Sequence, residues 1–283
     1  MENFSNKTVI ITGGSEGVGA ATARKFADAG AKLLLVARGR NNLEKIAAEL
    51  RHQTQVLITA MDVTDERACA ALFDQAESEF GAVHVLINNA GYHERGYVET
   101  VATEDLGRMI DVNLKAPILL CRLAIPRMRT VEGGAAIVNV ASLAGRVPVR
   151  GAATYSASKF GLRAFTFALG EELRGTGIKL AVVSPGPIDT GFIMSNIDSV
   201  EDIVFSQPMS TSEEVADEIL KLCLNDRRER SMPPVSGMLA TLSYLFPALG
   251  RKLQPVLDRR GRRAKRRWRE KMAMHAGDET AKR

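Results

Sequence analysis

Residues 12–19, TGGSEGVG, decide the fold, because their glycines fall where a strand would turn into a helix. The β-branched run 8–12 leads into them, and residues 17–30 follow with apolar side chains at helical spacing. Such a turn must be tight, and glycine lets its backbone approach a phosphate group while the helix packs closely on the strand. The stretch therefore predicts a strand, a phosphate-binding turn and a helix.

The chain up to residue 224 repeats this alternation of short aliphatic runs and helical stretches. Buried parallel strands have near-continuous aliphatic sequences, and βαβ units with right-handed crossovers build a doubly wound sheet. We expect strands at 8–12, 32–37, 55–60, 83–88, 135–141 and 179–184, a short last strand near 227–234, and helices at 17–30, 41–51, 65–80, 103–129, 155–175 and 212–224. The sequence predicts an α/β protein with a Rossmann-type doubly wound parallel sheet, in which residues 1–234 form the nucleotide-binding and catalytic domain and 235–283 a helical, apolar-then-basic extension.

Composition excludes several other classes of protein. The 283 residues are 45% hydrophobic and 25% charged, which is ordinary for a globular chain and unlike collagen or a disordered protein. No apolar run reaches the ~18 residues of a spanning helix, and the first residues carry no apolar signal region. We therefore expect a cytoplasmic location. Cys69, Cys121 and Cys223 are far apart in the sequence, so we expect buried free thiols and no metal site.

The end of the second predicted strand bears on cofactor choice. Sites that prefer NAD place an acid there to accept a hydrogen bond from the ribose 2′-hydroxyl, whereas this sequence has Ala37 and Arg38. A guanidinium group suits the 2′-phosphate of NADP, so NADP(H) is the preferred cofactor. Glu16 in the glycine turn argues for the alternative, NAD(H), and a solvated loop charge is the other interpretation of Arg38.

Tyr155 and Lys159 stand one helical turn apart and can reach the same ligand. A phenol with a pKa near ~10 exchanges protons poorly at neutral pH unless a cation stabilises its phenolate, and Lys159 can supply that cation. The pair is a candidate acid/base. The alternative is an amphipathic surface helix with an extended lysine.

Taken in order, these motifs resemble the single-domain short-chain dehydrogenases/reductases over about residues 5–225. The matching pieces are Thr12-Gly13 with Gly17 and Gly19, Asp62-Val63, Asn88-Asn89-Ala90-Gly91, Asn113, Ser142, Tyr155 with Lys159, and Pro185-Gly186-Pro187-Ile188-Asp189-Thr190. The resemblance implies that Tyr155 exchanges a proton with the substrate oxygen while Ser142 holds that oxygen. It further implies that Lys159 lowers the Tyr155 pKa and binds the nicotinamide ribose, and that Asn113 anchors a water linking Lys159 to solvent.

The resemblance also implies a set of cofactor contacts and a reaction. The contacts are Thr12, Gly13, Ser15, Glu16, Gly17, Val18, Gly19, Arg38, Asp62, Val63, Asn89, Ala90, Gly91, Tyr155, Lys159, Pro185, Gly186, Ile188 and Thr190. The complete catalytic set favours an oxidoreductase that interconverts a ketone and a secondary alcohol. A non-catalytic NAD(P)-sensing binding protein of the same fold is the alternative. His93 follows Gly91 closely and either faces the substrate or is a bystander.

Two further expectations concern partners. The resemblance implies a homodimer or homotetramer packed through the helices at 103–129 and 155–175. Residues 251–271 carry eleven Lys or Arg against two acids, a net charge of +9. Preceded by the uncharged run 238–249, they favour peripheral contact with a membrane surface through an apolar stripe of Leu257, Ala264, Trp268 and Met272.

A solvated tail and an arm on a partner subunit are the alternatives for this extension, and nucleic acid is the least favoured partner. The glycine turn, the Val36-Ala37-Arg38 strand end and the extension together resemble 3-ketodihydrosphingosine reductases and related lipid-handling members. That resemblance implies a hydrophobic, lipid-like ketone as substrate.

Overall fold

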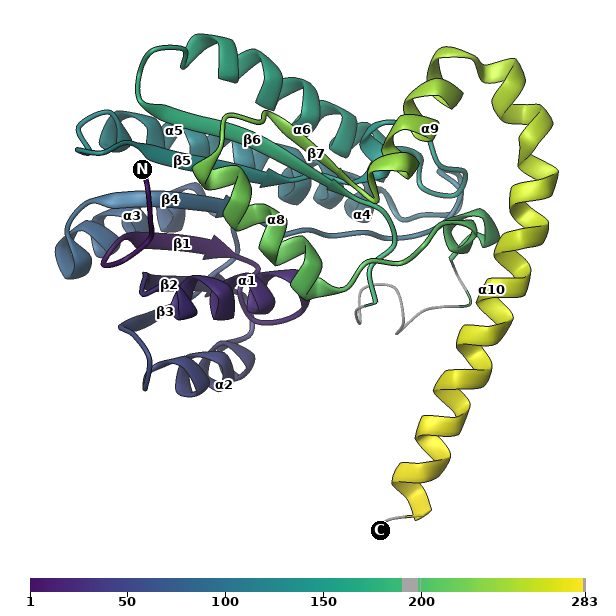
Figure 1. The fold of residues 1–283 in the computed structure, drawn as a ribbon, viewed down its shortest axis with the longest axis horizontal. Coiled ribbons are helices and arrows are strands. Elements are labelled where there is room, and N and C mark those ends of the chain that lie inside the picture. The colour runs from purple at the N-terminus through teal and green to yellow at the C-terminus, as the bar shows by residue number, and fades with distance from the viewer. Residues whose placement is uncertain (190–197, 199, 282–283) are drawn as a thin grey trace.

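A parallel sheet of seven strands lies between two layers of helices in the computed structural model, which describes residues 1–189, 198 and 200–281 (Figure 1). The strands are β1 Thr8–Thr12, β2 Lys32–Ala37, β3 Val56–Ala60, β4 Val83–Asn88, β5 Ala135–Val140, β6 Ile178–Pro185 and β7 Glu229–Met232. The helices are α1 Gly17–Asp28, α2 Arg40–Leu50, α3 Glu66–Phe80, α4 Thr103–Ile110, α5 Ala116–Met128, α6 Ala153–Glu172, α8 Ser212–Leu224, α9 Pro234–Leu245 and α10 Pro247–Ala281. The strand order β3-β2-β1-β4-β5-β6-β7 confirms the predicted doubly wound fold.

The predicted helix at 103–129 is interrupted, which corrects the sequence-based expectation. A π-helical segment, Asp111–Lys115, separates α4 from α5. Pro117 has no N–H to donate to the carbonyl of Asn113, four residues before it, and a wider turn accommodates that missing bond. The interruption falls on Asn113, one of the predicted catalytic residues.

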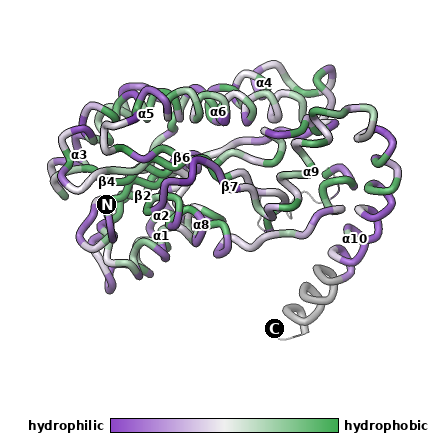
Figure 2. Tube along the Cα trace, turned by 45° about the horizontal axis from the view of Figure 1, so that its top comes forward, coloured by the Kyte–Doolittle hydropathy of each residue, from purple (hydrophilic) through white to green (hydrophobic). Residues whose placement is uncertain are grey.

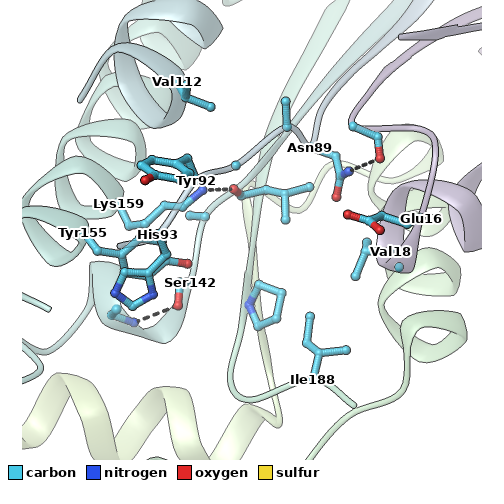
Figure 3. Close-up of a pocket in the computed structure, with 18 of the residues that line it drawn as sticks. Glu16, Val18, Asn89, Tyr92, His93, Val112, Ser142, Tyr155, Lys159 and Ile188 are labelled. Carbon is cyan, nitrogen blue, oxygen red and sulfur yellow. Dashed lines mark hydrogen bonds between the residues drawn. The ribbon is translucent and has the colours of Figure 1, made fainter. Parts of the chain in front are cut away.

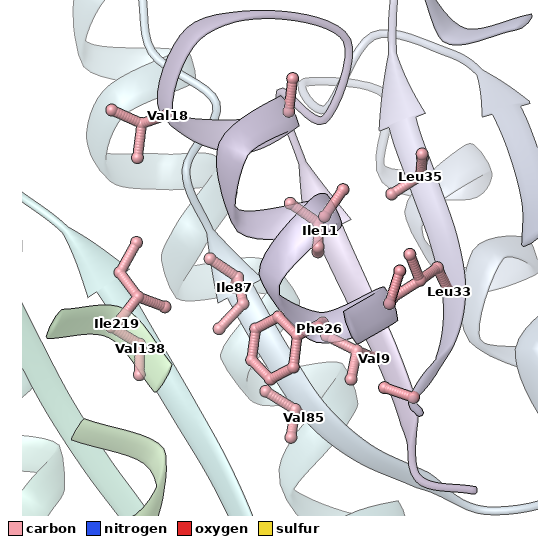
Figure 4. Packing of buried hydrophobic residues seen from close by; sticks show 14 of the residues in the cluster. Val9, Ile11, Val18, Phe26, Leu33, Leu35, Val85, Ile87, Val138 and Ile219 are labelled. Carbon is pink, nitrogen blue, oxygen red and sulfur yellow. The ribbon is translucent and has the colours of Figure 1, made fainter. Parts of the chain in front are cut away.

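Each face of the sheet has its own core. Side chains of α1, α2 and α8 pack on one face, where Phe26 lies fully buried against strand residues such as Val9 and Val85 (Figure 4). Side chains of α3, α5 and α6 pack on the other face. The five central strands β2, β1, β4, β5 and β6 are buried on both faces, which explains their largely aliphatic sequences. Cys69, Cys121 and Cys223 are buried free thiols, as predicted.

Two predicted helix starts are confirmed by their caps. The Asp65 side chain accepts hydrogen bonds from the backbone N–H groups of Arg67 and Ala68 at the start of α3. Thr211 and Glu214 form a reciprocal capping box at the start of α8. Each cap satisfies donors that the first helical turn leaves unbonded.

The last two helices leave the sheet and reach beyond it. Helix α10 is hydrophilic along most of its described length and runs beside the segment between β6 and α8 (Figure 2). Across the described residues, no helix combines the length and apolar character needed to cross a bilayer.

Candidate active site

A single cavity of about 710 Å³ lies beyond the carboxyl ends of the strands. It begins at the glycine turn after β1 and continues past the ends of β4, β5 and β6 to Tyr155. The sheet order reverses between β1 and β4, so the loops after these strands diverge and leave a crevice between them. Figure 3 shows Glu16, Val18 and Asn89 on one side of this crevice and Tyr155, Lys159 and His93 on the other.

The glycine turn has the backbone geometry that its sequence predicts. Gly13 and Gly17 have φ values of 65° and 51°, in the left-handed region where glycine is favoured. A Cβ at Gly19 would lie 2.0 Å from the Gly13 carbonyl oxygen, so only glycine allows α1 to pack this closely. Glu16, at the N-cap of α1, makes no side-chain capping bond, so its side chain does not occupy the amides of the first turn, and Gly17 and Val18 of that turn line the cavity.

Thr12 and Asn89 fix this turn to the loop after β4. The Thr12 hydroxyl accepts hydrogen bonds from the backbone N–H groups of Asn89 and Ala90, each at 3.0 Å. The Asn89 side-chain amide donates to the carbonyls of Thr12 and Gly13. Thr12 and Gly19 do not line the cavity itself, and they hold the turn in shape through the bonds of Thr12 and the close packing at Gly19. Their contact with the cofactor stays a prediction.

The other predicted cofactor contacts within the described residues do line the cavity. They are Gly13, Ser15, Glu16, Gly17, Val18, Arg38, Asp62, Val63, Asn89, Ala90, Gly91, Tyr155, Lys159, Pro185, Gly186 and Ile188. Thr190 lies outside the described residues. Gly39 and Asn42 line the cavity beside Arg38 and were not predicted, because a glycine and an asparagine after a strand are typical of any loop.

Tyr155, Ser142 and Lys159 meet at the far end of the cavity. Tyr155 and Ser142 line the same end of the cavity, and Ser142 is oriented by a bond from the Ala144 backbone N–H to its hydroxyl at 3.1 Å. The Lys159 ammonium is buried and donates to the Val140 carbonyl at 2.9 Å. Three of the four predicted catalytic side chains therefore come together: Ser142 from the N-cap of the 3-10 helix Leu143–Gly145 after β5, and Tyr155 and Lys159 from α6.

The pKa values in this cluster follow burial. Burial lowers the pKa of Lys159 to about 8. Burial also raises the pKa of the Tyr155 phenol, opposed by the polar Ser142 side chain and by the charge of Arg95. This direction is opposite to the lowering expected from Lys159, because both groups lie in a desolvated site that disfavours their charged forms.

Asn113 is fully buried in the π-helical segment. Its side-chain oxygen accepts from the backbone N–H of Tyr92 at 2.8 Å, and its amide donates to the Tyr92 carbonyl at 2.8 Å and to Ser158 Oγ at 3.2 Å. The Asn113 side chain thus ties the loop after β4 to α6.

His93 lies directly against Tyr155. The two rings are stacked, with centroids 4.0 Å apart and planes inclined by 15°. Burial, together with the charges of Arg95 and Lys159, lowers the pKa of His93 to about 3. His93 is therefore neutral at physiological pH and forms part of the cavity wall.

Sequence reasoning missed most of the wall beyond Tyr155. Arg95, Leu143, Val147, Val149, Ala152, Val200, Val204 and Gln207 line this end. Apart from Arg95 and Gln207 these side chains are apolar, and valines and leucines in loops have no spacing that marks them as part of a site. Among the described residues, no group of three or more His, Cys, Asp or Glu side chains could hold a metal ion.

A partly buried ion cluster joins the elements that surround Ser142. Glu229 in β7 accepts from Arg146 at 3.0 Å and from Arg163 at 2.8 Å. Arg146 follows the Leu143–Gly145 helix and also donates to Thr241 in α9, while Arg163 belongs to α6. The cluster therefore fixes the elements that carry Ser142 and Tyr155 to each other and to the sheet edge.

Known proteins resemble this chain over most of its length. A family model for short chain dehydrogenase matches residues 7–200. An uncharacterized oxidoreductase of Staphylococcus saprophyticus is 37% identical over 72% of this chain and 83% of its own. A sulfoacetaldehyde reductase of Chromohalobacter salexigens is 37% identical over 66% of this chain and 74% of its own. A ketoacyl reductase of a Nostoc species is 33% identical over 92% of this chain and 89% of its own.

Among solved structures, L-sorbose reductase from Gluconobacter frateurii, complexed with NADPH and L-sorbose, superimposes with a TM-score of 0.71. It is 27% identical, and the match covers 81% of this chain and 95% of that one. With its doubly wound sheet and the matches above, the protein belongs to the short-chain dehydrogenase family of NAD(P)-dependent oxidoreductases that act on CH–OH and C=O groups.

Proposed function

We propose that this protein is an NADP(H)-dependent reductase that interconverts a ketone and a secondary alcohol. One observation carries the proposal: Tyr155, Ser142 and the buried Lys159 stand at one end of a cavity whose other end is the glycine turn and Arg38. The cavity therefore has a proton-exchanging group at one end and an anion-binding turn at the other.

The residues of this cavity fit a nicotinamide dinucleotide. The uncapped first turn of α1 offers backbone N–H groups to a pyrophosphate, and the glycines leave no side chain in its way. The cavity is long enough to join Arg38 and Tyr155 without a break in its lining. Arg38 favours binding of the 2′-phosphate of NADP(H). The negative charge of Glu16 at the same end of the cavity disfavours that phosphate, so NAD(H) is the weaker alternative.

In the proposed mechanism, Tyr155 donates its proton to the ketone oxygen, or accepts one from the alcohol in the reverse direction. Ser142 holds the same oxygen, because its hydroxyl faces the same end of the cavity as the Tyr155 hydroxyl. The bound cofactor supplies or takes the hydride. Lys159, near the Tyr155 ring, stabilises the phenolate and binds the nicotinamide ribose, and Asn113 keeps the Tyr92 loop in register with α6.

We further infer that the ketone carries an apolar group. Leu143, Val147, Val149 and the Val200–Val204 segment form the wall past Tyr155. The similarity to a ketoacyl reductase over 92% of the chain supports a substrate of this kind. A long-chain keto lipid of the type handled by 3-ketodihydrosphingosine reductases remains our interpretation of the extension and the wall together.

The decisive experiment mixes the protein with NADPH and a panel of ketones. NADPH fluorescence reports binding, and loss of NADPH absorbance reports turnover. Turnover on ketones with apolar substituents supports the reductase. NADPH binding without turnover on a broad panel would favour the alternative, a binding protein that senses NADP(H).

We also propose that the protein assembles as a homodimer or homotetramer. Ile110 at the end of α4 and Ile118 in α5 expose more than a third of their surface on the helices that related enzymes use for assembly. Light scattering of the purified protein gives the mass directly. A monomer at all concentrations would contradict this proposal.

We propose a peripheral membrane contact on a different face from the one expected. Ala264 and Trp268 pack against Val200 and Phe205, so they are not available to a membrane, and the Met272 side chain lies outside the described side chains. The exposed apolar side chains instead follow one face of α9 and continue into α10: Val235, Met238, Leu239, Leu242, Leu245, Phe246, Leu253 and Val256. We name these residues the α9–α10 apolar surface.

Exposed cations border the α9–α10 apolar surface and indicate which kind of partner it binds. Arg251, Lys252, Arg259 and Arg260 are exposed beside it, which favours an anionic lipid surface over a second copy of this basic helix. The protein should sediment with phosphatidylglycerol vesicles and release as salt rises. Met238→Glu with Leu242→Glu should abolish sedimentation, whereas Val98→Glu, at an exposed valine elsewhere, should not. Self-association without sedimentation would assign the surface to a second copy instead.

A further inference from the structure

Helix α10 is anchored to the segment that precedes α8. The segment contains Val200 and the 3-10 helix Asp202–Ser206, and α10 crosses it through residues 261–269 (Figure 1). Trp268 and Ala264 pack on Val200 and Phe205, which are both almost fully buried. The basic extension is thus a packed part of the structure along these turns.

Lys265 is the centre of this contact. Only 6% of Lys265 is exposed, although its neighbours Arg262, Arg263, Arg266 and Arg267 are exposed cations. Its ammonium donates to the Val200 carbonyl at 2.6 Å and to the Asp198 carbonyl at 3.2 Å, and lies 3.7 Å from the Asp202 carboxylate. A buried ammonium is stable only with such partners, so this geometry specifies where the segment must lie.

Gly261 permits the close approach one turn earlier. A Cβ at this position would lie 1.8 Å from the Asp202 carbonyl oxygen, which is far inside van der Waals contact. Two independent features of α10, a missing side chain and a buried ammonium, therefore meet the same short segment.

That segment also forms the wall of the active-site cavity. Val200, Val204 and Gln207 line the cavity on the substrate side, away from the glycine turn. We infer that α10 sets the position of this wall and thereby determines which apolar substituents the enzyme accepts, with Lys265 as the positioning residue. The inference rests on the proposed function, since it concerns the substrate of the same site.

The test compares Lys265→Met with Arg267→Met on a series of 2-ketones of increasing chain length. Lys265→Met leaves the carbonyls of Val200 and Asp198 without their donor, whereas Arg267 is an exposed cation of the same helix. We expect the KM of Lys265→Met for the long ketones to rise roughly ten-fold or more, with the short ketones and the NADPH Kd unchanged. Arg267→Met should match the wild type, and hydrogen exchange at residues 200–206 should accelerate only in Lys265→Met.

A second pair of variants keeps every charge. Gly261→Ala improves helix propensity but forces α10 away from Asp202, while Gly250→Ala adds a Cβ that meets Ser243 at an ordinary 3.5 Å. Gly261→Ala should reproduce the loss on long ketones, and Gly250→Ala should not. If both Lys265→Met and Gly261→Ala keep the wild-type KM values, this inference is overturned and the proposed function still stands. A wild-type protein without turnover on any ketone would overturn the proposed function, and the inference with it.

Discussion

The imidazole of His93 lies flat against the phenol of Tyr155, with ring centroids 4.0 Å apart and an angle of 15° between the planes. The stack links the loop after β4 to α6 at the position of the proposed proton exchange. Because the His93 pKa is lowered to about 3, the ring stays neutral and does not compete for the proton that Tyr155 exchanges. We interpret His93 as the side chain that orients Tyr155.

Replacing His93 tests this orientation. His93→Ala removes the ring and frees the phenol, so kcat should fall roughly 10- to 100-fold while the NADPH Kd stays unchanged. His93→Phe keeps an aromatic face and should recover most of kcat. The pH profile of kcat should have the same shape in the wild type and in His93→Phe, and a displaced acidic limb would show that His93 titrates.

Tyr155→Phe tests the proton exchange itself. The variant keeps the ring and its stack on His93 but has no hydroxyl, so kcat should fall by the ~10² to 10⁴ typical of a lost general acid. NADPH fluorescence titration should give the same Kd. Tyr97→Phe, at an exposed tyrosine outside the cavity, serves as the control. Turnover that survives in Tyr155→Phe would remove Tyr155 from the mechanism.

Arg38→Asp tests the choice of cofactor. The substitution replaces a cation at the end of β2 with the acid that NAD sites use, so kcat/KM should shift from NADPH toward NADH. Arg40→Asp makes the same charge change two residues later, at an exposed position that does not line the cavity, and should leave the preference intact. Equal shifts in both variants would mean that overall charge, and not Arg38, sets the preference.

Lys159 should make stability depend on pH in a specific window. Its pKa is about 8 in the folded protein and 10.5 in a free lysine, so between these values the unfolded chain holds a proton that the folded chain has released. The free energy of unfolding should therefore rise with pH across this window, by up to about 1.4 kcal/mol per unit relative to Lys159→Met. Urea denaturation without cofactor measures it, and parallel pH profiles for the two proteins would contradict the shift.

Most of the fold could be predicted because the central strands are largely aliphatic runs that end in polar or glycine-rich turns. The ends of β1, β2 and β4 fall where the sequence predicts them for this reason. The break at Asp111–Lys115 could not be predicted from periodicity, because one wide turn shifts the apolar pattern by a single residue.

Site residues could be predicted where the type of residue indicates its chemistry. They could not be predicted where the role depends on which backbone groups the side chain contacts in the folded protein. Tyr155, Ser142 and Lys159 converge as expected. The Thr12 hydroxyl accepts hydrogen bonds from the backbone of Asn89 and Ala90, a pairing that the local sequence does not indicate. The contact between Lys265 and Val200 joins residues 65 positions apart through backbone carbonyls, which leave no trace in residue identity.

The separation of 65 positions between Val200 and Lys265 determines the order in which the two are synthesised. Ribosomes add about 5 to 20 residues per second and folding proceeds from the N-terminal side, so Lys265 follows Val200 by roughly 3 to 13 seconds. The glycine turn, Arg38 and the catalytic residues have all been made before this lysine exists. A growing chain therefore builds its nucleotide cleft first and receives the anchor of its substrate wall afterwards.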